Sequence, residues 1–216
     1  MDGTVVDTEP YWMAAETRLV ESFGGSWTHE DALQLVGSGL IDSAIILQAA
    51  GVRMEAQAIV DHLTDEVQRM LRTDGVPFRP GARELLLDLH EAGVPTALVT
   101  MSLRRMALSV VELIDFPAFR LVVAGDDVSE PKPHPEPYLR AAALLGIDIA
   151  DAVVIEDSPT GVRAGAASGA VTLGVPHIVP LDDAGAHELW PTLEGRRVAD
   201  LADLHDRRTT TAGAAR

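Results

Sequence analysis

The chain has 216 residues, of which 47% are apolar, 23% are charged and 4% are aromatic, so its core must be built mainly from Ala, Leu and Val. Its net charge of −16 argues against partners such as nucleic acid or anionic membranes, and the absence of cysteine excludes disulfides, thiolate catalysis and Cys-ligated zinc. No apolar run reaches membrane-spanning length and no signal-peptide pattern opens the chain, so we expect a cytoplasmic protein.

The first third of the chain is predicted to be helical from Tyr11 to Arg72. Apolar residues recur there at three- and four-residue spacing, and glycines separate the segments. No strand is expected in this block. The expected helices are Tyr11–Phe23, Thr28–Val36, Leu40–Ala50 and Ala56–Leu71.

From Pro80-Gly81 onward, helices alternate with short apolar strands. The expected helices are Ala82–Ala92, Leu103–Leu113, Pro135–Leu145 and Thr160–Ser168. The expected strands are Val94–Thr100, Leu121–Ala124, Ala152–Ile155 and Ala170–Leu173. This alternation predicts an α/β fold with a doubly wound parallel sheet, in which ligands bind at the carboxyl ends of the strands. We expect residues 1–9 and 75–206 to form this domain, residues 10–74 to be an inserted helical block, and residues 207–216 to be a flexible tail.

Polar residues stand at the expected carboxyl ends of the strands. Thr100, Met101 and Ser102 follow one strand and lead into a helix, an arrangement that can hold a phosphate but also suits a helix cap. Glu156 and Asp157 follow another strand. Two adjacent carboxylates suit a hard cation such as Mg²⁺, although Asp157 or Ser158 could equally cap the helix that begins at Pro159.

Lys132 is the only lysine among seventeen cationic Lys and Arg residues. It lies between Pro131 and Pro133, which stiffen the loop and fix the direction of the ammonium group. A lone lysine is usually a solvated surface residue. In a chain so biased toward arginine, its retention between two prolines favours a functional role.

Together these segments resemble the haloacid-dehalogenase-like (HAD) superfamily. Met1-Asp2-Gly3-Thr4-Val5-Val6-Asp7 is similar to the first motif of that family, with its leading aspartate absent. Thr100 matches the second motif, Lys132 the third, and Ile155-Glu156-Asp157-Ser158-Pro159-Thr160-Gly161 the fourth. The four matches follow the family's order and span nearly the whole chain. The helical block resembles the family's inserted all-helical cap on a Rossmann-like core, as in the beta-phosphoglucomutase-like branch.

The resemblance implies a role for each matched residue. Asp2 would be the general acid and base, and its carbonyl would bind Mg²⁺ together with Glu156 and Asp157. Thr100, Met101, Ser102 and Lys132 would bind the phosphoryl group, and Lys132 would also offset the crowded carboxylates. The attacking aspartate of the family would stand immediately before Met1, on an apolar central strand that the sequence also lacks. We expect the true chain to begin upstream and to restore both.

Phosphomonoester hydrolysis is the reaction that the residues favour. The expected substrate is a small phosphorylated metabolite, such as a sugar phosphate, and the expected state is a monomer or weak homodimer. A metal-independent dehalogenase would lack the carboxylate at Asp2, and a phosphonate hydrolase would need a lysine between Tyr11 and Arg72. A sugar-phosphate mutase, with Trp12 where a histidine would be expected, is the alternative reaction. A non-catalytic phosphate- or metal-binding remnant is the alternative of another class.

Overall fold

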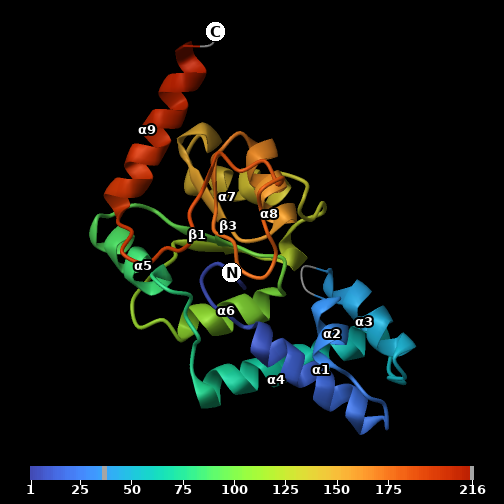
Figure 1. Ribbon diagram of the computed structural model, residues 1–216. Helices are drawn as coiled ribbons and strands as arrows, with labels where there is room; N and C mark the ends of the chain where they lie inside the picture. The colour runs from blue at the N-terminus through green and yellow to red at the C-terminus, as the bar shows by residue number, and fades with distance from the viewer. Residues whose placement is uncertain (36–37, 215–216) are drawn as a thin grey trace. The chain divides into compact units, whose positions relative to one another are not determined.

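The chain folds into two compact units (Figure 1). A computed structural model describes residues 1–35 and 38–214. One unit, which we call the sheet unit, consists of Met1–Val6 and Phe78–Arg216, and the other, the helical unit, is Asp7–Pro77. Within the sheet unit, Val6 and Phe78 form an antiparallel bridge. The chain therefore leaves and re-enters this unit at adjacent positions.

The helical unit contains the helices that the sequence predicts. They are α1 (Glu9–Ser22), α2 (His29–Leu33), α3 (Leu40–Ala49) and α4 (Ala56–Asp74). Thr28 begins α2 through a capping box, in which it accepts from the Asp31 amide while the Asp31 carboxylate accepts from the Thr28 amide. The expected extension of this helix to Val36 runs beyond Leu33, and residue 36 lies outside the described residues. Helix α4 packs against α1 and α3 through one buried apolar stripe.

The sheet unit alternates strands and helices as expected. Its strands are β1 (Ala97–Val99), β2 (Leu121–Val123), β3 (Val153–Glu156), β4 (Val171–Gly174) and β5 (Glu188–Leu189). Its α-helices are α5 (Ala82–Glu91), α6 (Arg104–Glu112), α7 (Glu136–Leu145), α8 (Pro159–Ser168) and α9 (Val198–Ala214). No helix in the described part of the chain is long and apolar enough to cross a membrane.

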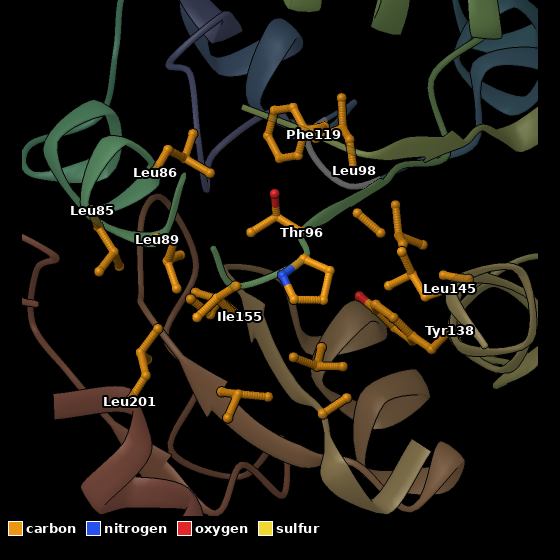
Figure 2. A pocket seen from close by; sticks show the side chains of 18 of the residues that line it. Leu85, Leu86, Leu89, Thr96, Leu98, Phe119, Tyr138, Leu145, Ile155 and Leu201 are labelled. Atoms are coloured by element: carbon orange, nitrogen blue, oxygen red, sulfur yellow. The ribbon is translucent and has the colours of Figure 1, made fainter. Parts of the chain in front are cut away.

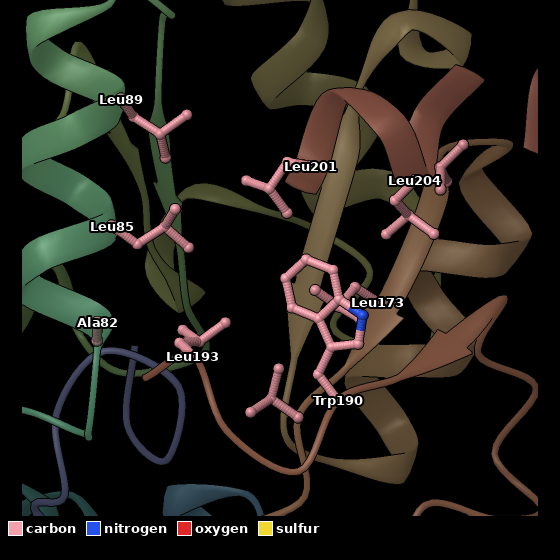
Figure 3. Packing of buried hydrophobic residues seen from close by; sticks show 10 residues of the cluster. Ala82, Leu85, Leu89, Leu173, Trp190, Leu193, Leu201 and Leu204 are labelled. Carbon is pink, nitrogen blue, oxygen red and sulfur yellow. The ribbon is translucent and has the colours of Figure 1, made fainter. Parts of the chain in front are cut away.

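All of the strand pairs are parallel, and helices cover both faces of the sheet. β1 pairs with β2, and β3 pairs with β4, which pairs with β5. Val153 and Ile155 pack with an apolar cluster from α5, β4 and α9 (Figure 3). Val154, which points the other way, packs with Tyr138 of α7 and Ala164 of α8. The doubly wound α/β architecture is therefore confirmed.

Two expectations need correction. The strand expected over Val94–Thr100 is only Ala97–Val99, because it pairs with a neighbour on one edge alone and Pro95 has no amide to donate. The tail expected from residue 207 onward is instead helical as far as Ala214. Arg207 and Arg208 form ion pairs with Glu188, which holds the start of that segment against the sheet unit.

An apolar cavity of about 520 Å³ lies between β1 and β3 (Figure 2). It separates the described strands into a two-stranded and a three-stranded sheet. Protein interiors contain few voids larger than a water molecule. The apolar side chains that line it therefore lack the packing contacts that a filled core would supply.

The glycines that flank α5 provide a test of the packing. Gly81, before α5, has φ of +77°, and a Cβ there would lie 2.2 Å from the carbonyl carbon of Leu193. Gly93, after α5, has φ of +72° with open space around it. Gly81→Ala should lower the free energy of unfolding by about 2–5 kcal/mol, through both backbone strain and overpacking. Gly93→Ala should cost only about 1–2 kcal/mol, since strain alone acts there. Equal losses in urea denaturation would contradict this account.

Candidate active site

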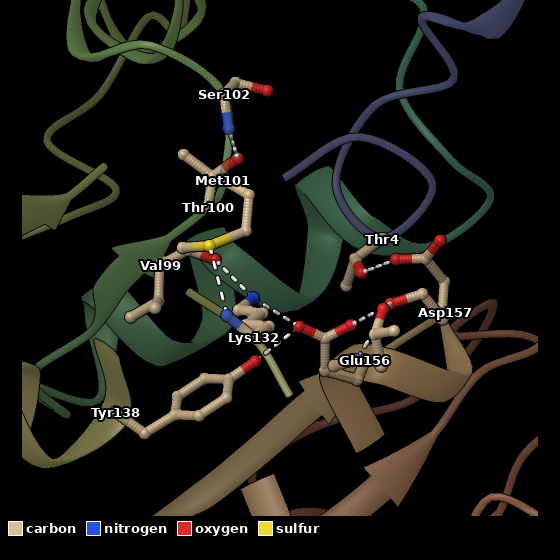
Figure 4. Close-up of polar contacts among 12 residues, drawn as sticks. Thr4, Val99, Thr100, Met101, Ser102, Lys132, Tyr138, Glu156 and Asp157 are labelled. Carbon is tan, nitrogen blue, oxygen red and sulfur yellow. Dashed lines mark hydrogen bonds and ion pairs between the residues drawn. The ribbon is translucent and has the colours of Figure 1, made fainter. Parts of the chain in front are cut away.

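A buried ion pair forms the centre of the site (Figure 4). Lys132 Nζ donates to Oε1 of Glu156 at 2.6 Å, at the end of β3, and to the carbonyl oxygen of Val99 at 3.1 Å, at the end of β1. The two charged side chains are 8% and 7% exposed. The sole lysine is therefore not a solvated surface residue, and it connects the carboxyl ends of two strands.

Tyr138 and Ser158 complete the hydrogen bonding of Glu156. Tyr138 Oη donates to Oε1, and its ring centroid lies 4.8 Å from Lys132 Nζ. Ser158 Oγ donates to Oε2 at 3.2 Å. Burial disfavours the charge on Glu156, but the Lys132 ammonium, the amino terminus and these hydrogen bonds together hold its pKa below the ordinary value. Burial, followed by the nearby Glu156 charge, raises the pKa of Tyr138 well above its ordinary value.

Asp157 does not cap the following helix. Its Oδ1 accepts from Thr4 Oγ1 at 2.5 Å, whereas Ser158 caps α8 by accepting from the Gly161 amide at 3.1 Å. The alternative that Asp157 merely caps the helix is thereby excluded. Burial, and then the negative charge of Glu156, raise the pKa of Asp157 to about 6. Gly3 lies so close that a Cβ there would fall 2.0 Å from Asp157 Oδ2.

Asp2 lies beside the residues that follow β1. Ser102 Oγ donates to Asp2 Oδ2 at 2.7 Å, and the Ser102 amide donates to Thr100 Oγ1 at 3.1 Å. The Thr100 side chain is therefore buried in the turn that leads to α6. Met101 Sδ accepts from the Lys132 amide at 3.4 Å. The structure thus joins the predicted site residues into three hydrogen-bonded groups, one around Asp2 and Ser102, one around Lys132 and Glu156, and one of Thr4 with Asp157.

The donor set is compatible with Mg²⁺ but not with a closed protein cage. The described residues contain no cluster of three or more His, Asp or Glu side chains arranged to hold a metal. Both carboxylate oxygens of Glu156 accept hydrogen bonds from the chain. The pKa of Asp157 is raised, as expected for a carboxylate that lies close to another negative charge and would be stabilised by a bound cation. Mg²⁺ commonly binds through one or two carboxylates and keeps several waters.

Sequence reasoning missed three supporting residues. Tyr138 and Thr4 each hold a carboxylate of the Glu156-Asp157 pair. Gly161 packs against Glu156 so closely that a Cβ there would lie 1.9 Å from Oε2. Thr4 and Gly161 lie within the first and fourth motifs, which was a usable signal, whereas Tyr138 lies in α7 outside every motif.

The chain is similar to a known family and to several known proteins. Residues 1–175 match the family model described as haloacid dehalogenase-like hydrolase. Hexitol phosphatase A of Escherichia coli is 30% identical over 181 residues, which cover 81% of this chain and 80% of that protein. The phosphorylated carbohydrates phosphatase of Thermotoga maritima is 31% identical over 174 residues, covering 78% of this chain and 79% of that protein.

A longer plant protein shows a similar level of identity. The bifunctional riboflavin kinase/FMN phosphatase of Arabidopsis thaliana is 31% identical over 182 residues, which cover 82% of this chain and 47% of that protein. This chain therefore spans about half of the plant protein.

The fold is shared with solved structures. CbbY from Rhodobacter sphaeroides in complex with phosphate has a TM-score of 0.82 at 24% identity, covering 94% of this chain and 96% of that one. The beta-phosphoglucomutase of Clostridium difficile has a TM-score of 0.79 at 19% identity, covering 97% and 96%.

Fold, site and comparisons define a class, a hydrolase with a Rossmann-like fold whose carboxylates and lysine gather at the carboxyl edge of parallel strands. The chain belongs to the haloacid dehalogenase-like hydrolase family, among the phosphoric monoester hydrolases.

The raised pKa of Asp157 predicts how stability depends on pH without divalent cations. Between the ordinary value of 3.8 and about 6, the folded chain binds more protons than the unfolded chain, so its stability should fall as pH rises through this window. Asp157→Asn removes the charge, and at pH 7 in EDTA it should raise the free energy of unfolding by about 1–3 kcal/mol.

The control for that variant is Asp151→Asn, at an exposed position whose carboxyl does not enter the site. It should leave the pH profile of urea denaturation unchanged. Two results would contradict this account: stability that does not change between pH 4 and 6 in the wild type, or an Asp157→Asn protein that is less stable than wild type at pH 7. Either would show that the charged form of Asp157 does not destabilise the folded chain.

Proposed function

We propose that the protein hydrolyses a small phosphomonoester, such as a sugar phosphate, with Mg²⁺ and through an aspartyl-phosphate intermediate. Two relatives that are 30% or more identical over about four-fifths of this chain are named as phosphatases of hexitol phosphates or phosphorylated carbohydrates. Their names support the substrate class, and the family supports hydrolysis.

The observation that carries this proposal is the convergence of four distant chain segments on one edge of the sheet unit. Asp2 contacts Ser102, Thr4 contacts Asp157, and Lys132 contacts Glu156. These three contacts support a site that combines a candidate proton donor, a cation and two acidic side chains. A phosphoryl group needs this combination, because its transfer depends mainly on positioning and charge stabilisation.

Each residue has a separate task in the proposed reaction. A carboxylate attacks phosphorus while Asp2 gives its proton to the leaving alcohol, and Asp2 then takes a proton from the water that hydrolyses the acyl phosphate. Ser102 orients Asp2 through their hydrogen bond. Lys132 supplies positive charge for the phosphoryl oxygens, and Glu156 fixes its ammonium at 2.6 Å.

Asp157 and the carbonyl of Asp2 would hold Mg²⁺, with Glu156 in support. When bound, the ion would supply charge stabilisation for the phosphoryl oxygens. The attacking carboxylate would enter on a segment joined to the amino side of Met1. That position is supported by Met1 itself, which is 7% exposed and lines the cavity between β1 and β3.

The test compares the 216-residue chain with a chain extended before Met1 by an apolar strand that ends in aspartate. With Mg²⁺, the extended chain should release phosphate from hexitol phosphates and from an aryl phosphate, whereas the shorter chain should not. In the extended chain, Asp2→Asn should slow turnover by about 10²–10⁴-fold. Lys132→Arg should also be severely impaired, because a planar guanidinium cannot reproduce the contacts of a compact, buried ammonium.

Asp183→Asn is the matched control, since this carboxylate is exposed and far along the chain from the site motifs. It should keep full activity. Equal turnover by the short and extended chains would mean that another residue attacks phosphorus. An extended chain that folds and binds Mg²⁺ but hydrolyses none of these esters would favour a non-catalytic binding module.

A further inference from the structure

Lys132 lies in the irregular connection between β2 and α7. The 3₁₀ turn Gly125–Asp127 follows β2, and the next helix is α7, which begins at Glu136. Connections of this kind are usually the more mobile parts of a fold. The Lys132 ammonium is nevertheless held between the Val99 carbonyl and Glu156 (Figure 4). Because a lysine side chain is long and has many rotamers, its ammonium keeps one position only if the backbone that carries it is also fixed.

The Glu136 carboxylate fastens the middle of this connection to the start of α7. Its Oε1 accepts from the Ser129 amide at 2.9 Å, and its Oε2 accepts from the Glu130 amide at 2.8 Å. These two hydrogen bonds hold the pKa of Glu136 below its ordinary value, because an ionised carboxylate accepts them better than a neutral one. The segment that contains Lys132 is therefore closed into a loop by one carboxylate.

Further hydrogen bonds tie this loop together on either side of Lys132. The His134 amide donates to the Pro131 carbonyl at 2.9 Å, and the Glu136 amide donates to Nδ1 of His134 at 3.2 Å. The Lys132 amide itself donates to Met101 Sδ at 3.4 Å. Lys132 therefore lies in a closed loop whose two ends meet at Glu136, so the position of its backbone depends on the bonds of that residue.

Glu136 also lies where a negative charge favours helix formation. It is the first residue of α7, and a carboxylate in the first turn of a helix is stabilised by the helix dipole. That effect alone would stabilise α7 and leave Lys132 unaffected. Both carboxylate oxygens, however, contact amides of the preceding loop, so a second effect on that loop is expected.

We propose that Glu136 is a positioning residue for Lys132. By holding the Ser129 and Glu130 amides, its carboxylate fixes the loop from which the Lys132 ammonium reaches the sheet edge. This role rests on the proposed function only in that the ammonium is expected to bind the phosphoryl group. Loss of the carboxylate should therefore release Lys132 from its fixed position while the sheet unit stays folded.

The test measures how fast Lys132 reacts with an amine-acetylating ester. Lys132 is the only lysine in the chain, so the peptide that contains it reports this site alone in mass spectrometry. The wild-type chain should react slowly, because the Lys132 side chain is 8% exposed and paired with Glu156. Glu136→Gln leaves one acceptor oxygen in place of two, so one loop amide loses its partner. It should react at least about fivefold faster, since reaction through a briefly opened loop follows the population of the open form.

Two further variants separate the position of the carboxylate from its charge. Glu130→Gln removes one negative charge from an exposed side chain of the same loop and keeps the amide that donates to Glu136, so it should react at the wild-type rate. Glu136→Asp keeps the charge but reaches less far, and its rate should lie between those of the wild type and Glu136→Gln. If Glu136→Gln does not fold, Glu136→Asp carries the comparison and must react faster than the wild type.

Hydrogen exchange distinguishes a local release of Lys132 from a general loosening. The Leu173 amide lies in β4, which pairs on both sides, and its exchange should be the same in the wild type and in Glu136→Gln. The proposal is overturned if Glu136→Gln and the wild type react at the same rate, or if Glu130→Gln accelerates the reaction equally. It is also overturned if exchange at Leu173 rises as much as the reactivity of Lys132.

Inorganic phosphate is the probe for the expected role of the ammonium. With Mg²⁺, phosphate should slow the acetylation of Lys132 in the wild type, and the same concentration should protect Glu136→Gln less. Equal protection of both chains would overturn the positioning role. If phosphate does not protect wild-type Lys132, the phosphoryl-binding role of Lys132 is wrong, whereas the rates without phosphate still decide whether Glu136 positions it.

Discussion

The site depends on one buried ion pair, between Lys132 and Glu156. Taking two charges out of water is expensive, and the attraction between them offsets that cost only where the remaining donors and acceptors are satisfied. Here Tyr138 and Ser158 donate to the carboxylate, and the Val99 carbonyl accepts a second bond from the ammonium. The result is a positive charge fixed at the sheet edge, in a chain whose net charge is −16.

The same ion pair connects two parts of the sheet unit that are not joined by strand pairing. Between β1 and β3 the described structure has a cavity where ladder hydrogen bonds would stand, yet Lys132 reaches the ends of both strands. The polar edge is therefore organised although the apolar interior beneath it is not filled. Polar contacts at the edge do not replace the buried apolar area that a filled interior would supply.

The adjacent carboxylates of Glu156 and Asp157 bring two negative charges to the end of β3, and this arrangement favours the binding of a cation. Glu156 is paired with Lys132, and its neighbour Asp157 lies beside that buried charge and accepts a hydrogen bond from Thr4. Adjacent carboxylates along a strand end point in different directions, so one can serve the lysine and the other can face a cation. The close approach of Gly3 to Asp157 brings the first segment of the chain, with Asp2, to the same place.

The sequence by itself determined the order of the elements as far as β4, whereas β5 and α9 were not predicted. Spacing of apolar residues located the helices and the strands within a few residues, and the motifs located Asp2, Lys132 and Glu156-Asp157, because these signals are local in the chain. Only the tertiary structure decided that Tyr138 supports Glu156, that Thr4 rather than the next helix engages Asp157, and that the interior between β1 and β3 is hollow. The physical reason is distance along the chain. Thr4 and Asp157 are separated by 153 positions, and packing alone brings such residues together.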